Sequence, residues 1–183
     1  MPSLLEGVRQ FREYLLEVGA AQSTLNLPAP RMLAYVASDD ELDPQNLFGA
    51  LITEPEIVNV SRDLFVSGHF SLAIQEALKA LEKVIQTKAG NNLSGTSLME
   101  QVFSPKVPLL VWSARRTRSE QDEQLGYHRL FSGAVLGIRN PCAHEFKWVD
   151  DAETGLEILC FAQHLLKKAK VASRTEDVVA DCP

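Results

Sequence analysis

Apolar residues recur at every third or fourth position over most of this chain, and the alternation typical of strands is nearly absent. This spacing gives a helix one continuous apolar face to bury. The clearest stretch runs from Phe70 to Ile85. The chain is therefore predicted to be all-α, a bundle of about five to six helices with an N-terminal helical extension.

Local capping signals divide this pattern into elements. Thr53 and Glu56 enclose a proline and predict a helix start with a capping box, and an Ala-Gly pair at 89–90 predicts a helix end. The remaining signals place a short helix near 96–103 and a longer helix that begins at Ser119 with Asp122. A last helix is capped by the residues from Asp150 to Glu153 and runs to about Val171. The predicted buried stripe of the helix after residue 53 is Ile57, Val60 and Leu64.

The same signals predict three parts of the chain. Residues 1–50 form an N-terminal helix at 3–18 followed by a connection that contains an acidic run at 38–44. Residues 51–172 form the helical domain. Residues 173–183 form a polar, flexible tail.

Three glycines lie within the predicted helix that leads to residue 138. Gly126, Gly133 and Gly137 each cost roughly 1 kcal/mol of helix stability relative to alanine. Close packing of a neighbouring helix against this face would compensate for that cost.

Composition narrows the class of protein. A chain of 183 residues with 45% hydrophobic residues fits one ordinary globular domain, and a net charge of −6 argues against a protein that coats nucleic acid over its whole surface. The sequence contains no run of about 18 apolar residues, so no membrane span is predicted, and no signal peptide is recognisable. Three scattered cysteines fit reduced thiols, so we expect a cytoplasmic protein.

An arginine and a histidine flank an Asn-Pro pair near the end of the predicted domain. On an unbroken helix Arg139 and His144 would lie roughly 140° apart. Pro141 within a helix removes a hydrogen bond and crowds the carbonyl group of Gly137. Asn140 followed by proline also fits the N-cap and first position of a new helix. We expect a kink or break there, which turns the arginine, the asparagine and the histidine toward one cleft.

Such a cleft would suit cleavage of RNA. The fork of donors on arginine matches phosphate, and histidine exchanges protons near neutral pH. The RNA 2′-hydroxyl would attack its own phosphorus, with His144 moving the proton and Arg139 stabilising the charged oxygens. A two-fold homodimer would supply a second imidazole. No metal or cofactor is expected, because the sequence contains no cluster of metal-ligand residues.

Spacing alone leaves a structural role open. Arginine and histidine at a kink also serve as capping and salt-bridge residues. Glu145 or Asp150 could pair with Arg139, and His144 could bond to a backbone carbonyl. The alternative function is therefore a non-catalytic module for dimerisation or for binding a nucleotide or protein.

Arg-Asn-Pro-x-x-His at the end of a helix, in a small all-α protein, resembles the Arg-x4–6-His motif of the HEPN superfamily. Over most of residues 53–172 the chain looks like the Ymh-like group of hypothetical proteins. The residues that carry this likeness are Ser67-Gly68-His69-Phe70, Ala73, Glu76, Ala77, Lys79, Gly95, Leu98-Met99, Phe103, Gly126, Leu130-Phe131, Gly133-Ala134, Ile138 to Pro141 and His144-Glu145.

The resemblance implies a helical bundle that dimerises with the motif in a shared cleft. HEPN proteins are commonly metal-independent ribonucleases of phage defence, toxin–antitoxin pairs and RNA processing, and some instead bind nucleotides or proteins. By carry-over, Arg139 and His144 are the catalytic pair and Asn140 is the polar residue after the arginine. We expect a toxin or antiphage-defence endoribonuclease whose partners are RNA, a second copy and an antitoxin or other defence-system protein.

A basic stretch at 104–119 adds a candidate RNA contact. Arg115, Arg116 and Arg118 could bind the phosphate backbone, although a solvated loop is the simpler interpretation. Trp112 beside them could stack on a base or pack in the core.

Overall fold

The computed structural model describes residues 9–14, 16–17, 44–145 and 147–180 of the chain. The chain divides into two compact units, Met1–Ala50 and Leu51–Pro183. In the first unit, residues 9–14 and 16–17 are helical, within the helix predicted at 3–18. The other residues of that helix, and the acidic run up to residue 43, lie outside the described residues. Helix α2 begins at Pro44 and ends at Leu51.

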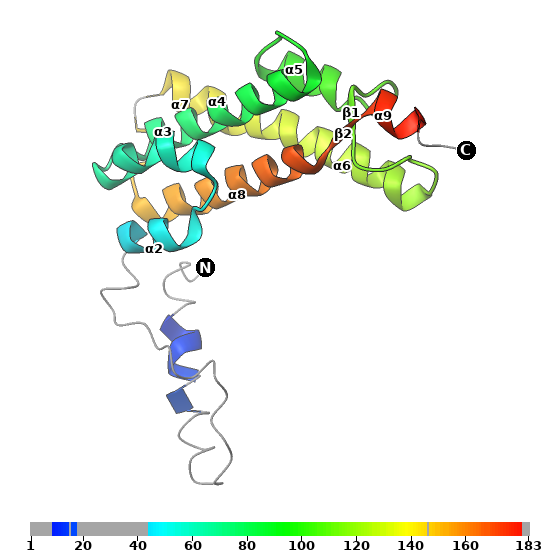
Figure 1. The fold of residues 1–183 in the computed structure, drawn as a ribbon. Helices are drawn as coiled ribbons and strands as arrows, with labels where there is room; N and C mark the ends of the chain where they lie inside the picture. The colour runs from blue at the N-terminus through cyan, green and yellow to red at the C-terminus, as the bar shows by residue number, and fades with distance from the viewer. Residues whose placement is uncertain (1–8, 15, 18–43, 146, 181–183) are drawn as a thin grey trace. The chain divides into compact units, whose positions relative to one another are not determined.

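Long helices that run alongside one another build the second unit (Figure 1). Its elements are α3 (Pro55–Val66), α4 (Phe70–Ala89), α5 (Gly95–Val102), β1 (Leu110–Val111), α6 (Arg118–Ala134), the π-helical turn η3 (Val135–Arg139), α7 (Asn140–His144), α8 (Ala152–Val171), β2 (Ser173–Arg174) and α9 (Thr175–Ala180). The predicted all-α class is confirmed. Among the described residues, no helix has the length and apolar character needed to cross a membrane.

Helix α4 supplies a large part of the core. Every member of its predicted apolar stripe is buried, and the helix ends one residue before Gly90, which adopts the left-handed conformation at φ 64°. Gly155 lets α8 approach closely, because a Cβ there would lie 3.2 Å from Cβ of Phe70 and 3.3 Å from a ring atom of Phe65. The predicted core of α4 is confirmed.

The predicted buried face of α3 was correct at Ile57, but its other two members, Val60 and Leu64, each lie one position before the residue that is buried. Ile57, Ser61 and Phe65 are the buried residues, and Val60 is 38% exposed. The error arose because a serine occupies the centre of the buried face. Its hydroxyl donates to the carbonyl oxygen of Ile57 at 2.7 Å, which satisfies it without an outside partner.

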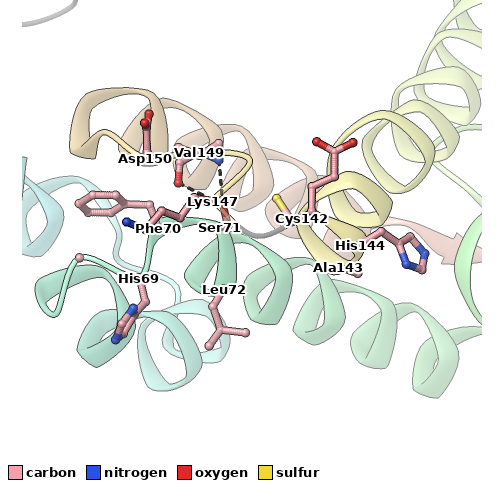
Figure 2. Close-up of a pocket in the computed structure, with 12 residues that line it drawn as sticks. His69, Phe70, Ser71, Leu72, Cys142, Ala143, His144, Lys147, Val149 and Asp150 are labelled. Carbon is pink, nitrogen blue, oxygen red and sulfur yellow. Dashed lines mark hydrogen bonds between the residues drawn. The ribbon is translucent and has the colours of Figure 1, made fainter.

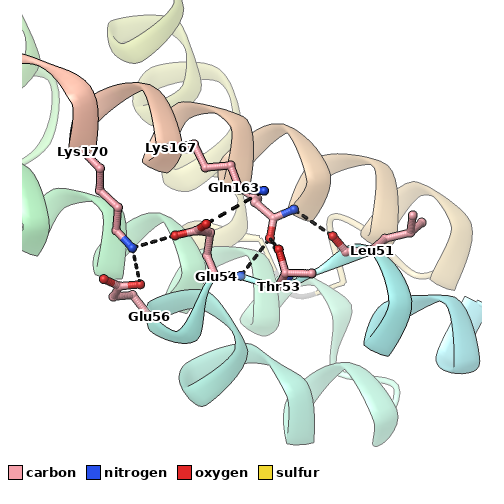
Figure 3. A network of polar contacts seen from close by, with 7 residues as sticks. All are labelled: Leu51, Thr53, Glu54, Glu56, Gln163, Lys167 and Lys170. Atoms are coloured by element: carbon pink, nitrogen blue, oxygen red, sulfur yellow. Dashed lines mark hydrogen bonds and ion pairs between the residues drawn. The ribbon is translucent and has the colours of Figure 1, made fainter.

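The start of α3 is held by a side chain from α8 (Figure 3). Oε1 of Gln163 accepts from the backbone N–H groups of Thr53 at 2.6 Å and Glu54 at 3.0 Å, and its Nε2 donates to the carbonyl oxygen of Leu51 at 2.8 Å. The predicted capping box of Thr53 and Glu56 does not form, since no side chain of α3 caps its own N-terminus. A glutamine more than a hundred residues away instead binds the N–H groups of the two residues that precede the helix.

Ion pairs extend this contact toward the end of α8. Nζ of Lys170 lies 2.6 Å from Glu54 and 2.8 Å from Glu56, one carboxylate on each side (Figure 3). The hydrogen bond from Lys170 lowers the pKa of Glu56 below its ordinary value of 4.5. Charge pairing thus joins α3 and α8 at the surface.

The start of α6 lies earlier than predicted. Thr117, not Ser119, is the N-cap, and it forms a capping box with Glu120. The Glu120 carboxylate also accepts from the N–H of Arg116 at 2.6 Å. Asp122 instead pairs with Arg118 on the exposed side of the first turn.

Backbone pairing holds the first residues after α8 against the rest of the unit. Ser173 pairs with Val111 and Arg174 with Leu110 in a short antiparallel ladder. Thr175 then donates from its N–H to Leu109 and from its hydroxyl to Pro108. Residues 181–183 lie outside the described residues.

We predict that Gln163→Met lowers the free energy of unfolding by about 1–3 kcal/mol, because it leaves two N–H groups and one carbonyl without partners. Urea denaturation followed by circular dichroism measures this change. Gln86→Ala is the control, since it removes one bond to the Leu93 carbonyl at an exposed site. An equal, small effect of both substitutions would show that Gln163 does not hold the helix start.

The pairing of Lys170 with Glu56 predicts a pH dependence. Because the pKa of Glu56 is lowered in the folded state, its contribution to stability is present above its unfolded-state pKa and is lost as the pH falls through its folded-state pKa. The stability difference between wild type and Lys170→Met, measured by denaturation, should therefore shrink as the pH falls below about 4.5. Lys83→Met, at an exposed position, should show no such trend. A difference independent of pH in this acid range contradicts the assignment.

Candidate functional site

The Arg139–His144 segment continues the helix that precedes it instead of breaking from it. Helix α6 passes into the π-helical turn η3, where the N–H of Asn140 donates to the carbonyl oxygen of Val135, five residues back. Arg139 and Asn140 both keep right-handed helical dihedrals, with φ −60° and −67°. The predicted helix break at 139–141 is therefore replaced by a π-helical turn at Val135–Arg139, and Asn140 is not the N-cap of a new helix.

Pro141 explains the wider turn. Proline has no N–H to donate to the residue four positions back, and its ring crowds the carbonyl group at that position. A π-helical turn shifts the bonding by one residue and relieves this conflict without ending the helix. Such turns occur often at functional sites because they re-aim side chains within a rigid element.

Arg139 points toward a buried carboxylate on α4. Its Nε lies 3.7 Å from Oε1 of Glu82, which is only 5% exposed. The other oxygen of Glu82 accepts from the N–H of Gly95 at 3.3 Å, at the start of α5. The ion-pair partner of Arg139 is therefore Glu82, and neither Glu145 nor Asp150.

Asn140 lies beside the guanidinium and accepts a hydrogen bond from it at 3.2 Å, from Nη1 of Arg139 to Oδ1. The Nε–H of Arg139 has no hydrogen-bond acceptor among the described residues, because 3.7 Å to Glu82 is too long for a hydrogen bond. The arginine is thus oriented by two neighbours while it keeps donors for a further anion.

His144 is the last residue of α7 and is exposed. It lies at the edge of a pocket of about 490 Å³, whose lining comes from the start of α4, from α7 and from the loop that follows (Figure 2). The lining is Gly68, His69, Phe70, Ser71, Leu72, Cys142, Ala143, His144, Glu145, Lys147, Val149 and Asp150. An exposed imidazole beside a hollow is accessible to a substrate.

Arg139 and Asn140 do not line this pocket. The structure therefore brings the arginine and the asparagine together against α4, and places His144 about 7 Å farther along the helix axis. His69 lines the same pocket, but Figure 2 shows its ring at the opposite end, pointing away from that of His144. Among the described residues, His144 is thus the imidazole on the same helical segment as Arg139.

The loop after α7 is fixed by Ser71 on α4. Its Oγ accepts from the N–H of Val149 at 2.8 Å and donates to the carbonyl oxygen of the same residue at 3.1 Å (Figure 2). Lys147, within this loop, has a left-handed backbone at φ 59°, which is uncommon for a residue with a side chain. The far wall of the pocket is therefore tied to the core.

Cys142 lines the pocket as a thiol of low reactivity. Burial raises its pKa to about 11, so it stays protonated at neutral pH and is a poor nucleophile.

Other histidines of α6 and α8 bond to neighbouring side chains. Nε2 of His128 lies 2.8 Å from a carboxylate oxygen of Glu100 on α5. His164 bonds the hydroxyl of Tyr127 at 2.9 Å. Both contacts join neighbouring helices.

The predicted RNA-binding arginines lie at the other end of the helix. Arg118 begins α6, twenty-one residues before Arg139, which corresponds to roughly 30 Å along the axis. Nη1 of Arg115 donates to the carbonyl oxygen of Pro105 at 3.0 Å, and the N–H of Arg116 donates to Glu120. Trp112 is half-buried and packs against the core, stacked on Phe103 at 5.1 Å between ring centroids.

Sequence reasoning missed Glu82 and Ser71. Glu82 had a signal, because it is a carboxylate next to Leu81 within the apolar stripe of α4. Such a residue in a buried face implies a cationic partner. Ser71 gave no signal, since its partner is a backbone segment seventy-eight residues away.

We predict that Glu82 and Arg139 are energetically coupled. In a double-mutant cycle with Glu82→Gln and Arg139→Met, measured by urea denaturation, the coupling energy should be about 1–2 kcal/mol, because each single substitution strands the partner. A parallel cycle with the exposed pair Arg118 and Asp122 should give less than about 0.5 kcal/mol. Equal coupling in the two pairs would contradict an arginine held by a buried carboxylate.

One protein family matches most of the second unit. Its model, described as "Protein of unknown function (Hypoth_ymh)", matches residues 52–169. No curated protein and no solved structure matches the chain significantly. The family match spans more than half of the 183 residues, so the chain belongs to the Hypoth_ymh family, as its ordered residues predicted.

Proposed function

We propose that this protein is a metal-independent endoribonuclease of the HEPN type, which acts as a toxin or antiphage-defence effector in a prokaryote or phage. One observation carries the proposal. The helix continues through Pro141 by a π-helical turn, so that Arg139 is oriented beside Asn140 while His144 is exposed at the edge of a pocket.

The reaction assigns one task to each side chain. His144 removes the proton from the RNA 2′-hydroxyl, which attacks the adjacent phosphorus and expels the 5′-oxygen, leaving a 2′,3′-cyclic phosphate. Arg139 donates to the phosphorane oxygens, with Asn140 and Glu82 holding its guanidinium. The departing 5′-oxygen needs a proton from a second group.

A homodimer supplies that group. The exposed face of α6, η3 and α7 carries Leu130 (44% exposed), Leu136 (63% exposed), Gly133 and Gly137, and it ends at the motif. The glycines were predicted to pack against a neighbouring helix, but among the described residues outside their own helix backbone nothing lies within 4 Å of a Cβ built on either one. A second copy on this face would compensate for their cost in helix stability and would bring a second His144 to the site.

The alternative function has one observation in its favour. The ion pair of Arg139 with buried Glu82 is also what a purely structural arginine would form. In that case the domain is a non-catalytic module that dimerises or binds a nucleotide or protein. Growth arrest on expression that requires Arg139 favours the nuclease, whereas a harmless protein that co-purifies with a nucleotide favours this alternative.

We predict that the purified protein cleaves RNA in the presence of EDTA and leaves 2′,3′-cyclic phosphate ends. His144→Ala should lower the rate by about 100-fold or more, because the reaction then lacks the imidazole that removes the 2′-hydroxyl proton. Denaturing gels of labelled RNA and end-group analysis measure both. His164→Ala is the matched control and should retain the rate, since that histidine bonds Tyr127 away from the pocket. Undiminished cleavage by the His144 variant would reject the assignment.

We also predict opposite effects of Gly133→Ala on folding and association. The substitution should raise the free energy of unfolding by up to about 1 kcal/mol. Alanine has a higher helix propensity than glycine, and its added methyl group meets open space. It should weaken the homodimer, which light scattering across a dilution series measures. Gly126→Ala, three turns before the motif on the same helix, should stabilise without weakening association. A monomeric wild type contradicts the composite site.

A further inference from the structure

A second pocket, of about 440 Å³, lies beside the first turns of α6. It is lined by residues of α6 and of the loop before it and shares no lining residue with the pocket at His144. Pockets of a few hundred cubic ångströms that combine apolar walls with a few fixed polar groups are typical of small-molecule sites.

Gln124 gives this pocket a fixed polar group. The residue is 2% exposed, and its Nε2 donates to the carbonyl oxygens of Phe103 at 3.1 Å and Leu110 at 3.2 Å. These two acceptors fix which end of the amide is nitrogen. Its Oε1 is buried and has no hydrogen-bond partner among the described residues. A buried carbonyl oxygen in this state favours a ligand that presents an N–H group.

Arg115 gives the pocket an oriented cation. Its backbone is left-handed, at φ 55°, a conformation that costs energy for a residue with a side chain. Three hydrogen bonds hold it: its N–H donates to Ser113 at 3.3 Å, its carbonyl accepts from Gln121 at 3.2 Å, and its Nη1 donates to Pro105 at 3.0 Å. The guanidinium is thereby fixed at the pocket wall while it retains further N–H groups.

Arg118 and Asp122 complete the polar lining as an exposed ion pair 3.1 Å apart. The carboxylate offsets one of the two positive charges, so the pocket keeps a net charge of about +1 from these groups. A carboxylate oxygen can also accept from a hydroxyl group. Pro105, Ala114 and Leu125 supply apolar surface.

We propose that this pocket binds a nucleoside phosphate. An N–H group of the base donates to Oε1 of Gln124, the base lies against the apolar lining, a ribose hydroxyl donates to Asp122, and the phosphate binds Arg115 and Arg118. The same chemistry is present in a free mononucleotide and in one nucleotide of an RNA strand. The inference goes beyond the proposed nuclease, because it requires neither Arg139 nor His144.

Calorimetric titration of the full-length His144→Ala protein tests the proposal, since this variant leaves RNA ligands intact. The probes are the four ribonucleoside 5′-monophosphates, ribose 5-phosphate and inorganic phosphate. At least one mononucleotide should bind about tenfold more tightly than ribose 5-phosphate, because only the nucleotide reaches Gln124. Arg115→Ala with Arg118→Ala should weaken this binding by about tenfold or more.

Ala114→Trp fills the pocket without removing a charge and should abolish the preference for nucleotide over ribose 5-phosphate. Arg62→Ala, an exposed arginine of α3, is the control and should bind like the parent. Thermal unfolding checks that each variant is folded. Competition of a single-stranded oligoribonucleotide with the mononucleotide assigns the pocket to RNA, and lack of competition assigns it to free nucleotide. Two results would overturn the proposal. In the first, mononucleotides bind no better than inorganic phosphate. In the second, the folded Ala114→Trp protein still prefers a mononucleotide to ribose 5-phosphate.

Discussion

Pro141 within a continuous helix is the constraint on which the candidate site depends. A proline in this position must either end the helix or change its hydrogen bonding, and here a π-helical turn changes the bonding. The helix axis therefore continues from α6 into α7, and the side chains on either side of the proline receive different surroundings. Arg139 is turned toward Glu82 in the core, whereas His144 reaches the surface at the end of α7.

Helix packing and side-chain contacts from α4 together hold this segment in place. Helices α4 and α8 form a rigid core in which Gly155 permits close approach, and Gln163 fixes the start of α3. Helix α4 also carries both Glu82 and Ser71, so one element orients the arginine and ties the loop beyond the histidine. The two halves of the motif are thus positioned by a common support, as the proposed reaction requires.

The sequence predicted what depends on neighbouring residues. Gly90 ends α4 and Asp151 caps the start of α8, so each residue acts on the terminus of its own helix. It could not predict contacts between distant segments, such as the cap that Gln163 provides for α3 or the pairing of Arg139 with Glu82. The form of the turn at Pro141 was missed for a related reason. An Asn-Pro pair fits both a new helix and a π-helical turn, and packing of the flanking helix against α4 decides between them.

The central claim is that Arg139 and His144 act on one phosphate. The most direct measurement is a crystal structure of the protein with an RNA whose 2′-hydroxyls are replaced by hydrogen, so that it binds without cleavage. The account predicts a phosphate within about 3 Å of the Arg139 guanidinium, with an imidazole of His144 within hydrogen-bonding distance of the same backbone linkage. An RNA bound elsewhere, with Arg139 in contact only with Glu82 and Asn140, would contradict it.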